Sequence, residues 1–152
     1  MSVRLSPDEA WDVLERSHTG ILTTLCADGM PIALPVWFVT LDRRVYVATP
    51  AGTKKVARLR RDPRVSFLVE SGLRWVELRA VHLTGTAAIV SEPALLGRVR
   101  ARLDTKYAGF RTARSAMPEA TRRHYAAPQA VIEIVPDARM LTWNNARLEL
   151  AD

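Results

Sequence analysis

The sequence predicts a mainly β domain, with most of the chain in one antiparallel sheet and helices at its periphery. From Thr19 onward, short segments rich in Val, Ile, Leu and Thr alternate with turn signals, as antiparallel strands require. Two other segments, Ser6–Ser17 and Pro93–Leu103, carry apolar residues at helical spacing. The chain has 152 residues, the size of one ordinary domain, so we expect a single domain over 1–152.

The first element should be a short helix. Ser6-Pro7-Asp8-Glu9 combines an N-cap serine, a proline at the first helical position and a glutamate that can complete a capping box. The helix should continue to about Ser17. Its apolar stripe predicts that it packs as a flap on the sheet; the stripe is Ala10, Trp11, Val13 and Leu14.

The sheet should begin with a hairpin. Ile21–Cys26 predicts the first strand, and Asp28-Gly29 predicts a tight turn with two left-handed residues. Met30–Leu41 should then return as one strand beside the first. Pro31 and Pro35 cannot donate ladder hydrogen bonds, which places part of that strand at an edge or bulge.

The remaining elements are expected in a simple order. They are strands at Val45–Thr49, Val65–Glu70 and Trp75–Val90 with a bend at Gly85, a helix opened by Ser91-Glu92-Pro93, an irregular stretch over 109–118, a short helix at Glu119–Tyr125, and closing strands at Ala130–Val135 and Met140–Trp143.

The sequence also bears on the cellular compartment in which we expect the protein. The longest uncharged apolar run, Met30–Leu41, contains two prolines and is shorter than the roughly 20 residues of a membrane-spanning helix. No apolar signal segment is found near Arg4 and Pro7, and Cys26 is the only cysteine. We therefore expect a cytoplasmic protein without a membrane span.

Several kinds of site lack support. The net charge of +6 is spread over many arginines without aromatic interleaving, which disfavours nucleic acid as the partner. His18, His82 and His124 lie far apart and form no metal motif. Cys26 fits a small buried residue better than a nucleophile, and no serine hydrolase motif is present. With no catalytic side chain indicated, the chemistry is expected to come from an organic cofactor.

The segment Thr49–Pro63 is the most informative. Thr53 is a good N-cap and Asp62-Pro63 a helix end, while Gly52 should free the backbone before the helix. The first turn carries Lys54 and Lys55 where the helix dipole favours anions. Either these lysines form a solvated basic face, or a bound phosphate offsets their repulsion; the strand, glycine and N-cap context favours the phosphate.

Motifs along most of the chain resemble those of the pyridoxamine 5′-phosphate oxidase-like split-barrel family, in particular its deazaflavin-dependent branch. The resemblance rests on Gly20-Ile21-Leu22-Thr23-Thr24, Asp28-Gly29 with Pro31, Pro35-Val36-Trp37-Phe38, Gly52-Thr53-Lys54-Lys55, Leu59-Arg60-Arg61-Asp62-Pro63-Arg64-Val65, Leu78-Arg79-Ala80-Val81 with Gly85, and Thr142-Trp143-Asn144-Asn145. The chain departs from the family at Asn144, Asn145 and Ala146.

The resemblance implies a split β-barrel with peripheral helices and a set of cofactor-binding residues. Thr53, Lys54 and Lys55 would hold the cofactor phosphate, with Lys55 as the leading residue. The other implied residues are Pro35, Val36 and Trp37 along the ring system, Ala48 and Thr49 beside the ribityl chain, and Arg79. Two roles stay open: Trp37 as a barrel-core aromatic, and Arg79 as a residue that only orients its strand.

The resemblance also implies a homodimer with the cofactor between subunits. The function it implies is hydride transfer between coenzyme F-420 or FMN and a small unsaturated or conjugated organic substrate. Coenzyme F-420 is favoured by the basic residues near the implied phosphate site, which would suit its polyglutamate tail; they are Lys54, Arg58, Arg60 and Arg61. The alternative is a non-enzymatic carrier or sensor of FMN, F-420 or haem.

Overall fold

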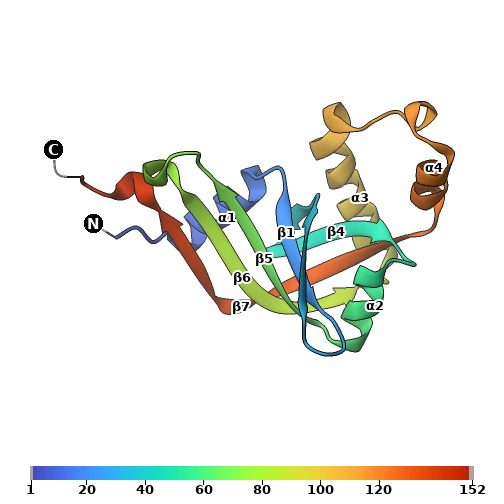
Figure 1. Cartoon of the computed structure of the whole chain (residues 1–152), viewed down its shortest axis with the longest axis horizontal. Coiled ribbons are helices and arrows are strands. Elements are labelled where there is room, and N and C mark those ends of the chain that lie inside the picture. Colours follow the sequence, from blue (N-terminus) through green and yellow to red (C-terminus); the bar gives the residue numbers. More distant parts are fainter. Residues whose placement is uncertain (1, 151–152) are drawn as a thin grey trace.

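The computed structural model describes residues 2–150 and contains one seven-stranded antiparallel sheet, curled and flanked by helices (Figure 1). The strand order is β2-β1-β5-β6-β7-β4-β3. The strands are β1 Gly20–Leu25, β2 Pro31–Val36, β3 Val39–Leu41, β4 Arg44–Pro50, β5 Arg64–Ser71, β6 Arg79–Ile89 and β7 Gln129–Asn144. The α-helices are α1 Pro7–Arg16, α2 Lys54–Arg61, α3 Pro93–Tyr107 and α4 Glu119–Ala126.

The sheet curls because its two edge strands are neighbours in the chain. β2 forms one edge and β3 the other, yet only Trp37 and Phe38 lie between them. Three peptide steps span about 10 Å at most, so the edges must come together. The prediction of one strand over Met30–Leu41 was therefore wrong: the chain leaves β1 after Val36 and pairs with β4 from Val39. The expectation of an edge strand is confirmed for β2.

Two apolar clusters sit on opposite sides of this sheet. The inner cluster fills the half-barrel with alternate residues of the strands, such as Leu22, Val45, Phe67 and Ile132, all at most 1% exposed. Helix α1 adds Ala10 and Leu14 to it, and α2 adds Leu59. The outer cluster lies under α3 and consists of Val39, Leu41, Tyr46, Val99, Leu103, Tyr107 and Val131. The helices thus close and cover the sheet at defined places.

Two local predictions were wrong in detail. In the first hairpin only Gly29 is left-handed, with φ of 86°, and its N–H donates to the Cys26 carbonyl over 2.9 Å. This is a turn followed by one left-handed glycine, which the three-residue loop requires. The strand predicted from Trp75 begins only at Arg79, because Trp75–Glu77 forms a 3-10 turn.

Strand β7 replaces the two closing strands predicted at Ala130–Val135 and Met140–Trp143. It runs without interruption over 16 residues and pairs with β6 on one side and β4 on the other. A register shift lies between Leu83 and Gly85, which confirms the bend expected at Gly85. A β-carbon on Gly85 would lie 2.4 Å from the Val135 carbonyl oxygen, so the close approach of β6 and β7 requires glycine.

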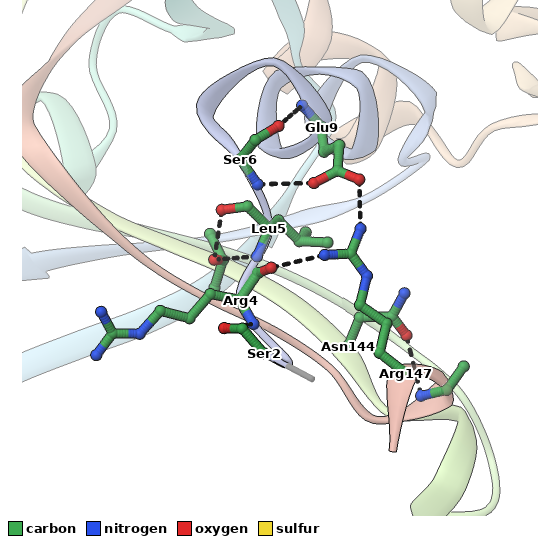
Figure 2. A network of polar contacts seen from close by, with 9 residues as sticks. Ser2, Arg4, Leu5, Ser6, Glu9, Asn144 and Arg147 are labelled. Carbon is green, nitrogen blue, oxygen red and sulfur yellow. Dashed lines mark hydrogen bonds and ion pairs between the residues drawn. The ribbon is translucent and has the colours of Figure 1, made fainter. Parts of the chain in front are cut away.

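Helix α1 is tied to the end of the chain by the polar network of Figure 2. The predicted capping box is confirmed: Glu9 N–H donates to Ser6 Oγ, and Ser6 N–H donates to the Glu9 carboxylate. Arg147 donates to both the Glu9 carboxylate and the Arg4 carbonyl, the latter over 2.7 Å. In residues 2–150, no helix is long and apolar enough to cross a membrane.

Candidate functional site

The barrel is left open between β2 and β4. The β3–β4 hairpin is paired from Val39–Tyr46 to Leu41–Arg44, so its ladder stops at Tyr46. Beyond that point, and among residues 2–150, β2 pairs only with β1 and residues 47–50 of β4 pair only with β7. Both strands leave the hairpin at the same end, with unpaired backbone edges. We call this opening the split. Strand β4 ends at Pro50 beside it, and α2 begins four residues later at Lys54.

Helix α2 begins beside the split with its first backbone donors unsatisfied. Thr53 is the N-cap, as predicted, and its Oγ1 accepts from Val56 N–H. The N–H groups of Lys54 and Lys55 have no partner within residues 2–150. The first turn holds no acidic residue, whereas α1 has Asp8 and Glu9 there. The start of α2 therefore presents two open donors and two ammonium groups, which an anionic group would satisfy.

The electrostatics of Lys55 agree with this arrangement. Lys55 is half-buried, and burial together with the nearby positive charge of Arg58 lowers its pKa below the ordinary value. Arg58 itself is anchored, since its Nε donates to Thr24 Oγ1 over 2.8 Å. Arg61 donates to the Leu25 carbonyl over 2.9 Å. These two bonds fix α2 against β1, and they commit two arginines that the sequence suggested for a cofactor tail.

Gly52 has a different role from the one expected. Its φ does not lie in the left-handed region, so the backbone does not need glycine for conformational freedom. A β-carbon at this position would meet no atom within 4 Å. The space in front of α2 is thus open, which leaves room for a ligand to approach the backbone.

The residues predicted along the ring system lie at the β2 side of the split. Val36 is 7% exposed and its side chain belongs to the inner cluster, so little of it is accessible to a ligand. Trp37 is 37% exposed and lies outside the inner cluster. Its ring stacks on Tyr107, with centroids 4.4 Å apart and planes 1° from parallel. Pro35 is exposed and lies on the edge strand β2, which pairs with β1 on its other side.

Ala48 and Thr49 lie on the opposite side of the split, just before α2. Ala48 is exposed, whereas Thr49 is 6% exposed. The structure thus gathers eight of the nine predicted residues around the split. The ninth, Arg79, lies at the start of β6, where it pairs with Ser71 of β5 and Asn144 of β7 and so is not on either strand that borders the split.

Sequence reasoning missed the side chains that hold the Trp37 end. The Tyr107 hydroxyl accepts from Phe38 N–H over 2.9 Å and donates to the His18 carbonyl over 2.7 Å. Burial raises the pKa of Tyr107. Lys106 donates to the Phe38 carbonyl over 3.0 Å, and burial lowers its pKa to about 8. The helical stripe through Val99 and Leu103 continues at four-residue spacing to Tyr107, and that spacing was the available signal.

Two surface cavities are distinct from the split. One of about 250 Å³ lies among residues of α1, β3 and α3, including Trp11, Glu15 and Arg102. The other, of about 260 Å³, lies beside the end of α2 among Arg60, Pro63 and Ala87–Ile89. Neither contains any of the nine predicted cofactor-binding residues, although the second includes Arg60. In the described part of the chain, no three His, Cys, Asp or Glu side chains gather as metal ligands.

A curled antiparallel sheet that stays open between two strands, with a helix starting at the opening, defines a split β-barrel. The family described as pyridoxamine 5′-phosphate oxidase matches residues 6–142, and the chain belongs to this family. The resemblance inferred from the sequence motifs is thereby confirmed.

Solved structures agree with this membership. The conserved hypothetical protein Rv2991 from Mycobacterium tuberculosis is 32% identical, with a TM-score of 0.82 over 99% of this chain and 92% of that one. An F-420 reductase is 23% identical, with a TM-score of 0.65 over 90% and 98%. HutZ, a haem storage protein from Vibrio cholerae, is 15% identical, with a TM-score of 0.67 over 94% and 96%. The last two show the shared fold alone. No curated protein matches the sequence.

Proposed function

We propose that the chain binds coenzyme F-420 or FMN at the split and uses it to transfer a hydride to a small conjugated substrate in the cytoplasm. One observation carries this proposal: the start of α2 presents two open backbone donors and the ammonium groups of Lys54 and Lys55. A phosphate there would offset both the unsatisfied donors and the repulsion between cations.

In this proposal the two sides of the split contact different parts of the cofactor. Thr53, Lys54 and Lys55 hold the phosphate, and Ala48 and Thr49 border the chain that joins phosphate and ring. Pro35 and the exposed part of Trp37 orient the ring system. When bound, the reduced cofactor supplies the hydride; the protein supplies position and exclusion of water.

Between the two cofactors we favour coenzyme F-420. Lys54 and Arg60 are exposed and carry no ion pair in residues 2–150, so they remain available for a polyanionic tail. Arg58 and Arg61 are hydrogen-bonded to β1 and are therefore less available to bind such a tail. Titration with both cofactors decides: binding of FMN without binding of F-420 would reverse the choice.

A second copy of the chain would complete the site. The strand register places a row of residues across the outer face of the sheet. In order they are Pro35, Ile21, Leu68, His82 and Leu141, and all except His82 are apolar. Leu141 is 66% exposed and Trp143 37%. We propose that this face forms a homodimer interface, because a partner would remove the apolar row from water. Light scattering of Leu141→Arg beside the unchanged protein tests it: a dimer that persists in the variant contradicts the interface.

The phosphate site is tested by measuring the affinities of Lys55→Ala for FMN and for F-420 in a fluorescence titration. We expect a loss of about tenfold or more for both, the effect of one charge-assisted hydrogen bond. Arg122→Ala is the matched control, because Arg122 is exposed on α4 and its removal changes the net charge equally. Unchanged affinity in Lys55→Ala would refute the site. Cofactor binding without turnover of enones or quinones would instead favour a carrier.

A further inference from the structure

Four aromatic rings from four segments meet where the chain leaves β2. His18 comes from the loop before β1, Trp37 from the link to β3, Tyr107 from the end of α3, and Phe110 from the 3-10 turn after it. The His18 ring lies edge-on to the other three, with centroids 5.7 Å from Trp37, 5.2 Å from Tyr107 and 4.5 Å from Phe110. We call these four residues the aromatic cluster.

The aromatic cluster is fixed on one side and exposed on the other. Tyr107 is fully buried, and its hydroxyl is held by the backbone of His18 and Phe38. Trp37 is held by its parallel contact with Tyr107. By contrast, His18 is exposed and Phe110 is 63% exposed. Preorganised rings with exposed edges and faces suit a planar conjugated ligand.

His18 is the side chain of this cluster that can exchange a proton. Its ring has no hydrogen-bond partner within residues 2–150. The Tyr107 hydroxyl is committed to the backbone, and Lys106 Nζ is committed to the Phe38 carbonyl and lies 4.0 Å above the Phe38 ring. The carboxylate of Glu15 acts on Lys106, whose pKa it raises against the larger effect of burial.

We propose that a conjugated carbonyl substrate stacks in the aromatic cluster and that His18 donates the proton it needs after hydride transfer. The inference rests on the proposed function, because only that function places a cofactor ring beside Trp37. The hydride, taken from the reduced flavin or deazaflavin, forms a C–H bond at the β-carbon and breaks the carbon–carbon π bond. Negative charge moves to the carbonyl oxygen.

The proton then balances the reaction. An N–H bond of the His18 ring breaks, its electron pair stays on the ring nitrogen, and the proton goes to the substrate oxygen. Water returns a proton to the imidazole. The substrate has been reduced by two electrons, and the cofactor has been oxidised by two.

Binding of a substrate mimic tests this role without turnover. 4-Nitrophenol is planar and has one ionisable oxygen, and its phenolate is visible by absorbance; nitrobenzene is a neutral analogue of similar size. Both are titrated into the protein with and without bound cofactor, at a fixed pH. We expect the unchanged protein to favour the phenolate. His18→Phe keeps a ring in the cluster without an N–H, and should lose about tenfold or more in phenolate affinity while nitrobenzene affinity stays the same.

His124→Phe is the control, because it removes an imidazole from α4, outside the aromatic cluster. It should bind both compounds as the unchanged protein does. Equal phenolate affinity in His18→Phe and the unchanged protein would overturn the proposal, as would the absence of any phenolate binding. A protein that binds neither FMN nor F-420 but keeps His18-dependent phenolate binding would refute the cofactor assignment alone.

Discussion

Arg58 Nε donates to Thr24 Oγ1 over 2.8 Å and so joins helix α2 to strand β1. Thr24 is 1% exposed and Arg58 is partly buried, so little water competes for the bond. Together with the bond from Arg61 to the Leu25 carbonyl, this contact holds the helix that begins at the proposed phosphate site.

Thr24→Val should weaken that connection. Valine keeps the shape of threonine but cannot accept a hydrogen bond, and we expect a loss of about 1 kcal/mol in the free energy of unfolding. Urea denaturation measures it. Thr23→Val is the matched control on the same strand, since the Thr23 side chain makes no hydrogen bond within residues 2–150. Equal effects of the two substitutions would show that Arg58 does not depend on Thr24.

Tyr107→Phe should be costly although it removes a single atom. The Phe38 N–H would lose its buried acceptor and the His18 carbonyl its donor, so we expect a loss of about 1–3 kcal/mol. Tyr125→Phe serves for comparison, because Tyr125 is 49% exposed. It should change stability by less than about 0.5 kcal/mol. A Tyr107→Phe protein as stable as Tyr125→Phe would mean that water replaces the hydroxyl.

Two glycine-to-alanine substitutions should differ in their effect on stability. A β-carbon on Gly20 would lie 2.1 Å from Phe67 Cζ in the inner cluster, so Gly20→Ala should cost about 1–3 kcal/mol through overpacking. At Gly52 the space is open and φ is not left-handed, so Gly52→Ala should be close to neutral for folding. Thermal denaturation of both variants tests the pair. If a ligand approaches at Gly52, the methyl group should reduce cofactor affinity alone.

Lys106 should give the protein a stability that depends on alkaline pH. Burial lowers its pKa from 10.5 to about 8 in the folded chain. Between these values the unfolded chain binds more protons, so stability rises as pH increases through this window. Below about pH 8 both states are protonated, and the cost of burying the ammonium group is fully present.

Lys106→Met isolates this effect from other titrating groups. The free energy of unfolding of the unchanged protein, minus that of the variant, should increase between about pH 8 and 10.5. Denaturation at several pH values in this window gives the difference. A difference that does not vary with pH would mean that Lys106 keeps its ordinary pKa in the folded protein.

Local signals predicted much of the fold because the physics involved is local. Ser6, Glu9 and Thr53 cap helices through contacts three residues apart, and the strands of the inner cluster show the alternation that one buried face imposes. The bend at Gly85 could be predicted from a single glycine in a long apolar segment.

What could not be predicted depends on contacts between distant segments. Nothing in Met30–Leu41 shows that its two halves pair with different strands, because that choice depends on how far the sheet curls. Likewise, the hydroxyl of Tyr107 meets residues 69 and 89 positions away. For the candidate site, the motif predicted Thr53, Lys54 and Lys55 at the start of α2, while the contacts of His18 and Phe110 depend on the folded arrangement of three loops.

The central position of β7 has a consequence for how the chain acquires its shape. β7 is the only element that pairs with both β6 and β4, so before residue 129 is made the described strands form two separate sheets, β2-β1-β5-β6 and β4-β3. The smaller one is a two-stranded ribbon, which is marginally stable alone in water. On the ribosome, the sheet that contains β2 and the ribbon that contains β4 would therefore stay unpaired with each other until β7 emerges.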